Sequence, residues 1–185
     1  NRHWPVYLMA YGYIPEPVTT LTSVKPLHKG CFLKYENSTK NISLQSFAHY
    51  SYSQKFGNEE EAKIQTAKLL DDSVKRHLLA DAPVGVFLSV GLDSGIIATL
   101  AARHKKTDLN TLSIYFEETE YSEKKFQDIL INQIKCNNYQ YLLKENEFHE
   151  SLPGILNSMD MPSCDGINTW FICKYAASRG LKAVL

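Results

Sequence analysis

The sequence predicts an α/β fold, with a parallel sheet that helices cover on both faces. Nearly continuous apolar runs, which are typical of strands buried on both sides, alternate with stretches of helical period. Glycine, proline or polar residues separate these runs. Such an alternation requires crossover connections, which align the strands in parallel and place the helices on the faces of the sheet.

Residues 1–45 differ in texture from the rest and predict short strands and turns. Val6–Met9 and Gly30–Tyr35 are β-prone, and two prolines and a Lys-Gly step mark turns between them. We therefore expect two parts, a small β segment at residues 1–45 and an α/β domain at residues 46–185.

The elements of the α/β part follow in order. Apolar residues recur at helical spacing from residue 58 to about residue 80, and Asp81-Ala82-Pro83 ends that helix. The buried strand Val84–Leu88 comes next. The expected strands cover residues 84–88, 109–116, 139–143 and 182–185. The expected helices cover residues 58–80, 94–104, 123–135, 145–158 and 169–178.

The loop after the first buried strand carries residues suited to phosphate. Ligands of open parallel sheets bind beyond the carboxyl ends of the strands. Gly91 allows a tight turn, Ser89 and Ser94 offer hydroxyl groups, and amides of the helix beginning at Ser94 add the positive end of its dipole. Asp93 would repel phosphate unless a cation lay between them, which points to Mg²⁺. A plain tight turn is the alternative.

The composition argues against several other classes. Twenty basic and twenty acidic residues cancel without clustering, whereas nucleic-acid-binding proteins are usually basic. No apolar run reaches the roughly 18 residues of a membrane span, so we expect neither nucleic acid nor membrane as a partner. Four cysteines without a Cys-x-x-Cys spacing indicate reduced thiols in a cytoplasmic protein rather than a zinc site.

Several motifs together resemble one family. Phe87-Leu88-Ser89-Val90-Gly91-Leu92-Asp93-Ser94 resembles the SGGxDS pyrophosphate loop of N-type ATP pyrophosphatases, in the FLSGGLDS form of glutamine-hydrolysing asparagine synthetases. The start of the chain, from Tyr7 to Gly30, is similar to the end of that family's glutaminase domain. Other segments resemble family motifs in the same order, namely Thr111–Glu117, Tyr121-Ser122-Glu123, Asp160-Met161-Pro162 and Pro162–Thr169.

The resemblance implies a fold, a reaction and a cellular setting. Residues 46–185 would begin an adenine nucleotide alpha hydrolase-like (PP-loop) domain, after a remnant of an N-terminal nucleophile glutaminase domain at residues 1–45. The full-length parent would be a cytoplasmic ligase that forms an amide on aspartate or a similar carboxylate through an acyl-adenylate. ATP, Mg²⁺ and glutamine-derived ammonia would take part, and a homodimer is expected.

The resemblance also implies site residues. Carried over by position, Leu88 and Ile114 would flank the adenine or ribose, and Asp93 would bind Mg²⁺. Asp160 and Asp165 would line an acceptor pocket, or alternatively cap helices. The whole implied ATP and pyrophosphate set is Leu88, Ser89, Val90, Gly91, Asp93, Ser94 and Ile114.

The chain departs from the family pattern at three places. Val90 replaces the first loop glycine, and a positive φ there would cost a β-branched residue about 1–2 kcal/mol. Met161 replaces an acidic or amide residue. The glutaminase cysteine and the second phosphate motif, Ser-Gly-x-Gly-x-Asp-Glu, are not in these 185 residues. We therefore expect a fragment without synthetase or glutaminase activity of its own.

Two alternatives stay open within this reading. A relative such as a β-lactam synthetase or a lasso-peptide cyclase adenylates a carboxylate for a different amine. A degenerate paralogue would bind nucleotide, or only partner proteins, without catalysis, and Val90 motivates that second alternative.

Overall fold

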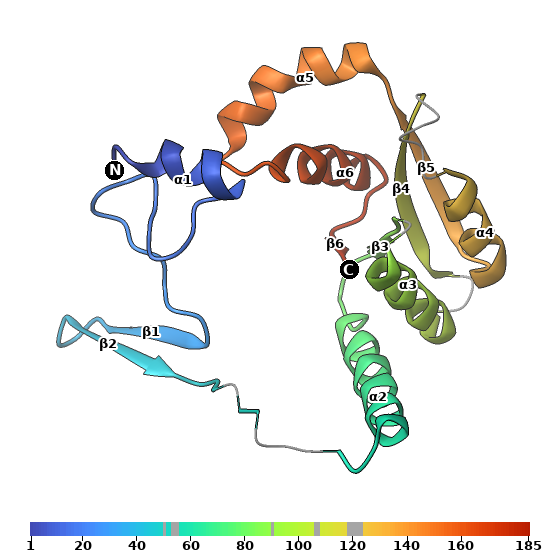
Figure 1. Cartoon of the computed structure of the whole chain (residues 1–185), viewed down its shortest axis with the longest axis horizontal. Helices are drawn as coiled ribbons and strands as arrows, with labels where there is room; N and C mark the ends of the chain where they lie inside the picture. The colour runs from blue at the N-terminus through green and yellow to red at the C-terminus, as the bar shows by residue number, and fades with distance from the viewer. Residues whose placement is uncertain (50, 53–55, 90, 106–107, 118–123) are drawn as a thin grey trace. The chain divides into compact units, whose positions relative to one another are not determined.

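The protein divides into two compact units. The computed structural model describes residues 1–49, 51–52, 56–89, 91–105, 108–117 and 124–185. One unit comprises residues 1–59 and 159–164, and the other comprises residues 60–158 and 165–185. Figure 1 gives the order of the elements along the chain. The first division between the units falls at Glu59. The domain boundary near residue 45 and the assignment of residues 1–45 to a glutaminase remnant stay predictions.

The first unit opens with a helix where the sequence predicted a strand. α1 (Trp4–Tyr11) has Pro5 in its first turn, a position that tolerates proline because no helical acceptor is needed there. It ends at Gly12, which has a φ of 73° and donates its N–H to the Leu8 carbonyl over 2.8 Å. The predicted strand at Val6–Met9 is therefore wrong, because these two end signals outweigh a β-prone run.

A hairpin follows in the first unit. β1 (Cys31–Glu36) pairs antiparallel with β2 (Asn41–Ser46). The strand predicted at residues 30–35 is confirmed, whereas its partner β2 was not predicted. Among the described residues of this unit, only Ile14 and Thr19 are buried, so its core is thin.

The second unit holds a four-stranded sheet in the order β5-β4-β3-β6, and every pairing in it is parallel. Its strands are β3 (Val84–Phe87), β4 (Asn110–Phe116), β5 (Asn137–Leu143) and β6 (Ala183–Val184). Its helices are α2 (Glu59–His77), α3 (Leu92–Lys105), α4 (Lys124–Ile134), α5 (Glu145–Ser158) and α6 (Gly166–Ser178). Every element predicted from residue 58 onward is confirmed within three residues at each end.

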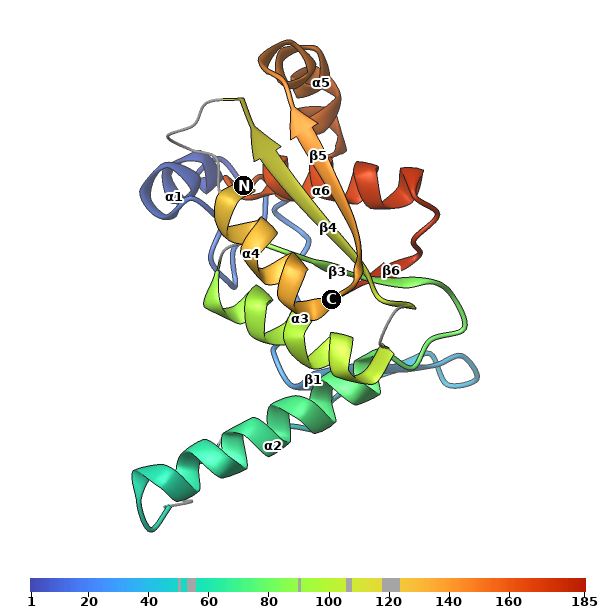
Figure 2. The ribbon, with the colours of Figure 1, turned by 90° about the vertical axis from the view of Figure 1, so that its right-hand side faces the viewer.

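Helices cover both faces of this sheet, as predicted. Figure 2 shows α3 and α4 on one face and α6 on the other. Side chains at the end of β3 and just after it alternate between the two faces. Val86 and Leu88 belong to the cluster that contains α3 residues, whereas Phe87 packs with Leu112 of β4 and Ala176 of α6. A strand buried on both faces accounts for the nearly continuous apolar run in the sequence.

The strand order creates a switch point at β3. The chain runs outward from β3 through β4 to β5, then returns through α5 and α6 and adds β6 on the other side of β3. The connections before and after this reversal lie on opposite faces. In open α/β sheets, such a point leaves a crevice beyond the carboxyl ends of the strands, where ligands bind.

Candidate functional site

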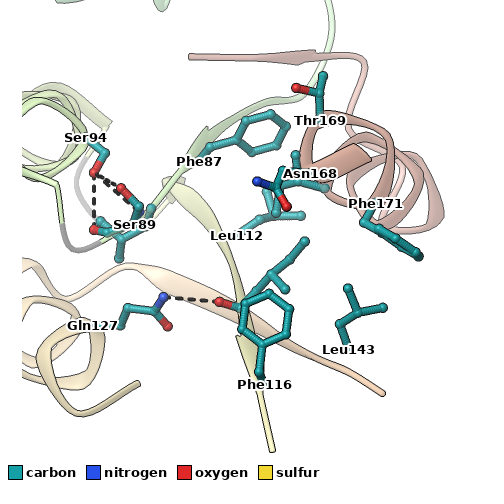
Figure 3. A pocket seen from close by; sticks show the side chains of 13 residues that line it. Phe87, Ser89, Ser94, Leu112, Phe116, Gln127, Leu143, Asn168, Thr169 and Phe171 are labelled. Carbon is teal, nitrogen blue, oxygen red and sulfur yellow. Dashed lines mark hydrogen bonds between the residues drawn. The ribbon is translucent and has the colours of Figure 1, made fainter. Parts of the chain in front are cut away.

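A pocket of about 420 Å³ lies in the second unit at the carboxyl ends of the strands (Figure 3). Three strands, three helices and the loop after β3 contribute to its mostly apolar wall. The lining residues are Phe87, Leu88, Ser89, Ser94, Leu112, Ile114, Phe116, Gln127, Leu143, Asn168, Thr169, Phe171 and Ile172. The site is thus at the switch point that the topology predicts.

Hydroxyl groups organise the loop from Ser89 to Ser94 at one side of the pocket. The Ser89 and Ser94 Oγ atoms lie 2.8 Å apart, within hydrogen-bond distance. The Gly91 N–H donates to Ser89 Oγ over 3.1 Å, and Ser94 Oγ lies 3.0 Å from the Gly91 carbonyl oxygen. These contacts tie Gly91 and Ser94 to Ser89, and Figure 3 shows the two serine side chains facing each other.

The loop leads into the N-terminus of α3. This helix begins at Leu92, two residues before the predicted Ser94, and near its start the Gly95 N–H donates to the Gly91 carbonyl over 3.0 Å. Amides of a first helical turn have no acceptor within the helix, and they carry the positive end of its dipole. The exposed carboxylate of Asp93 lies in this same turn.

Gly91 serves the loop by its lack of a side chain rather than by a special torsion angle. Its φ is not in the positive region that favours glycine. A Cβ atom at this position would lie 3.2 Å from Ser89 Oγ and 3.7 Å from Ser94 Oγ. The structure thus gives a further reason for glycine here, namely space beside the two hydroxyl groups, and the tight turn toward an anion stays a prediction.

The structure brings part of the predicted site together. Leu88, Ser89, Ser94 and Ile114 line the pocket, while Gly91 lies directly before α3 and Asp93 lies in the first turn of that helix. The prediction for Val90, including its strain, lies outside the described residues, as does the Tyr121-Ser122-Glu123 motif. The role of these residues in binding ATP stays a prediction.

The two carboxylates proposed for an acceptor pocket belong to different units. Asp160 lines a separate pocket of about 410 Å³ in the first unit, together with Met161. Asp165 lies in the second unit at the N-cap of α6, where its side chain makes no capping hydrogen bond. The next residues of α6, Asn168 and Thr169, line the larger pocket. An acceptor role for either carboxylate stays a prediction.

Gln127 lines the pocket but was not predicted from the sequence as a site residue. It lies in α4 on the same helical face as Leu130, Ile131 and Ile134, which pack against the core. Its side chain is only 2% exposed. A polar residue at a core position of an amphipathic helix is the signal that could have found it.

Comparisons of this sequence with known proteins find asparagine synthetases. The asparagine synthase family model matches residues 65–185. The chain is 30% identical to a putative glutamine-hydrolysing asparagine synthetase of Mycobacterium tuberculosis, over 94% of this chain and 27% of the relative. It is 26% identical to the glutamine-hydrolysing asparagine synthetase 1 of Bacillus subtilis, over 91% of this chain and 27% of that protein. The chain thus spans 27% of the length of each of these two relatives.

Solved structures show a partial likeness. An NH3-dependent NAD synthetase from Campylobacter jejuni aligns with a TM-score of 0.45 and 14% identity, over 65% of this chain and 54% of that one. An NMN synthetase from Francisella tularensis aligns with a TM-score of 0.44 and 15% identity, over 70% of this chain and 54% of that one.

In the part of the chain that the structure describes, no helix is both long and apolar enough to cross a membrane.

Proposed function

Because this chain belongs to the asparagine synthase family, we propose that its second unit supplies the ATP site of an amide-forming ligase. In the proposed reaction, a carboxylate of the aspartate type attacks the α-phosphorus of ATP, and the bond to pyrophosphate breaks. Ammonia from glutamine then attacks the acyl carbon and releases AMP. The acceptor, the ammonia source, a cytoplasmic location and a homodimer are proposals about the full-length protein.

The observation that carries this proposal is the pairing of a phosphate-type loop with an apolar pocket at one switch point. Ser89 and Ser94 offer hydroxyl groups, and the start of α3 offers backbone amides for the phosphate chain. Apolar side chains such as Ile114 and Phe171 suit the base. Fixed donors beside the phosphates would stabilise the charge that develops on the leaving pyrophosphate.

The donor set fits a Mg²⁺ ion that arrives with the nucleotide. The described residues contain no group of three or more His, Cys, Asp or Glu side chains that could hold a metal ion. Mg²⁺ commonly binds through one or two carboxylates together with phosphate oxygens and water. Asp93 can supply one such carboxylate from the first turn of α3, and the ion would neutralise charge on the phosphates.

The proposal is tested by calorimetric titration of ATP into the chain, with and without Mg²⁺, for the unmodified protein and Asp93→Asn. With Mg²⁺, the substitution should weaken binding about tenfold, or about 1.4 kcal/mol, because the ion loses its protein ligand. Without Mg²⁺, the same substitution should leave binding unchanged or strengthen it, because it removes a charge that repels phosphate.

Asp72→Asn is the matched control, since Asp72 is an exposed aspartate on α2 and is not among the pocket-lining residues. It should not change binding under either condition. Failure of ATP to bind the unmodified chain, with or without Mg²⁺, would contradict the proposed site. Equal effects of Asp93→Asn with and without Mg²⁺ would contradict the metal role alone.

A further inference from the structure

One buried polar atom of the pocket wall has an unmet hydrogen-bonding capacity. Among the described residues, two buried side-chain atoms lack a partner: Ser113 Oγ and Gln127 Oε1. Of these two residues, Gln127 lines the pocket and Ser113 does not. A buried acceptor without a donor destabilises the folded state, and a ligand N–H could remove that destabilisation.

The other end of the same amide sets its polarity. Gln127 Nε2 donates to the Ile114 carbonyl over 3.3 Å, and Ile114 itself lines the pocket. Figure 3 shows the nitrogen turned toward that carbonyl and the oxygen turned away from it. An inverted amide would place two oxygen acceptors together, so Gln127 is held as an acceptor toward the remaining space.

The pocket that Gln127 lines suits an aromatic ring. Leu112, Ile114, Phe116 and Phe171 are among its apolar lining residues, and Ser89 and Ser94 line it as well. The oxygen is enclosed in the present conformation. The last torsion of a glutamine side chain is soft, so the amide can turn and present the oxygen to a ligand without a change in the backbone.

We propose that Gln127 reads the base of the bound nucleotide, its Oε1 accepting a hydrogen bond from the exocyclic 6-amino group of adenine. This inference rests on the proposed nucleotide function of the pocket. Guanine carries an oxygen acceptor at the same ring position, which would face Oε1 without a shared proton. The residue is thus a specificity determinant for adenine over guanine nucleotides and for adenine over purine without the amino group.

The unmodified chain can be tested with ATP, GTP and purine riboside triphosphate, which lacks the 6-amino group, in calorimetric titrations with Mg²⁺. ATP should bind at least tenfold more tightly than either competitor, because each competitor leaves the buried oxygen unpaired. Gln127→Leu should bring the affinities for ATP and purine riboside triphosphate within about twofold of each other, since neither then finds an acceptor at that position.

Gln133→Leu is the matched control, because Gln133 is an exposed glutamine of the same helix. It should keep the full preference for ATP. A merely structural role of Gln127 would alter stability or all affinities together, not the ratio between nucleotides. Should Gln127→Leu fail to fold, the comparison of nucleotides on the unmodified chain can still overturn the proposal, because equal binding of ATP and purine riboside triphosphate would contradict it.

The outcomes separate the two proposals. Tight ATP binding with no preference over purine riboside triphosphate would overturn the role of Gln127 and leave the nucleotide site standing. Persistence of the preference in Gln127→Leu would overturn it in the same way. No binding of any of the three nucleotides would overturn both the nucleotide site and the assignment of Gln127.

Discussion

Gly91 is a residue whose importance lies in the atom it lacks. Its backbone is not in the left-handed region, so alanine could adopt the same torsion angles. The missing Cβ leaves room for Ser89 Oγ, which accepts from the Gly91 N–H and contacts Ser94 Oγ. An added methyl group 3.2 Å from that oxygen would press on the hydroxyl pair rather than on the backbone.

Gly91→Ala should therefore weaken ATP–Mg²⁺ binding about tenfold and change the free energy of unfolding by less than about 1 kcal/mol. Calorimetric titration and urea unfolding measure the two quantities. Gly154→Ala in α5 is the control, since nothing lies within 4 Å of its added Cβ. This control should stabilise the chain by about 0.5–1 kcal/mol without changing the affinity. Unchanged affinity in Gly91→Ala would contradict the role of the hydroxyl pair.

At the same scale, the sequence identifies the loop but not the whole pocket. A strand, a small polar loop and a helix fix where Ser89, Gly91 and Ser94 lie, because the pattern of local periods determines the topology. Gln127 lies 33 residues beyond Ser94 in the chain, and only tertiary packing brings it to the same pocket. The helical period can show that Gln127 is at a core position, but no local pattern in a single sequence shows which distant residues share its pocket.

Local signals also explain the successes and the failure among the elements. The helices and strands after residue 58 follow strong periods and are confirmed. The run Val6–Met9 is too short to show a period. The proline before it favours the start of a helix and Gly12 favours its end, and the segment forms α1. β2 alternates Ile42 and Leu44 with polar residues, but two apolar positions with mostly exposed neighbours make only a weak strand pattern.

At the scale of elements, one cluster joins β5, α5 and α6. The Tyr141 hydroxyl donates to Glu147, and Lys174 Nζ lies 3.2 Å from Glu147 Oε1. The Tyr141 ring also stacks on Tyr175 of α6, with 4.5 Å between ring centroids. The hydrogen bond from Tyr141, more than Lys174, holds the pKa of Glu147 below its ordinary value of 4.5. Burial, followed by the contact with Glu147, raises the pKa of Tyr141 to about 12.

A lowered folded-state pKa means that ionised Glu147 stabilises the fold above the ordinary pKa, and that this stabilisation is lost as pH falls through the lowered value. Tyr141→Phe keeps the ring and removes the donor. It should lower the free energy of unfolding by about 1–2 kcal/mol near neutral pH. The difference from the unmodified chain should shrink in acid, below the lowered pKa of Glu147. Urea unfolding across this pH range measures it.

Tyr139→Phe serves as the control for this cluster, because Tyr139 lies on the same strand and its ring faces the Arg179 guanidinium, with no hydrogen bond to Glu147. Its effect on stability should not vary with pH through the titration of Glu147. A pH-independent difference between Tyr141→Phe and the unmodified chain would show that the hydrogen bond to ionised Glu147 contributes nothing measurable.

At the scale of the whole molecule, the two units differ in how much they bury. Both hydrophobic clusters lie entirely in the second unit, as do all residues that line the larger pocket. In the described part of the first unit, burial is limited to Ile14 and Thr19. Since burial of apolar surface dominates folding free energy, the second unit should carry most of the stability of this chain.

A shortened chain of residues 60–185 should therefore fold and bind ATP–Mg²⁺ within about threefold of the intact chain, a difference below about 0.7 kcal/mol. Residues 159–164 would lose partners in the first unit, such as the Gly12 carbonyl that accepts from the Cys164 N–H over 3.0 Å. That loss should loosen the connection between α5 and α6 without reaching the strand ends. Circular dichroism during thermal unfolding and calorimetric titration measure both properties.

Ile14→Ala in the intact chain gives an independent check, because it weakens the first unit without shortening the chain. Loss of cooperative unfolding, or a tenfold loss of affinity in either variant, would mean that the first unit supports the nucleotide site rather than merely preceding it.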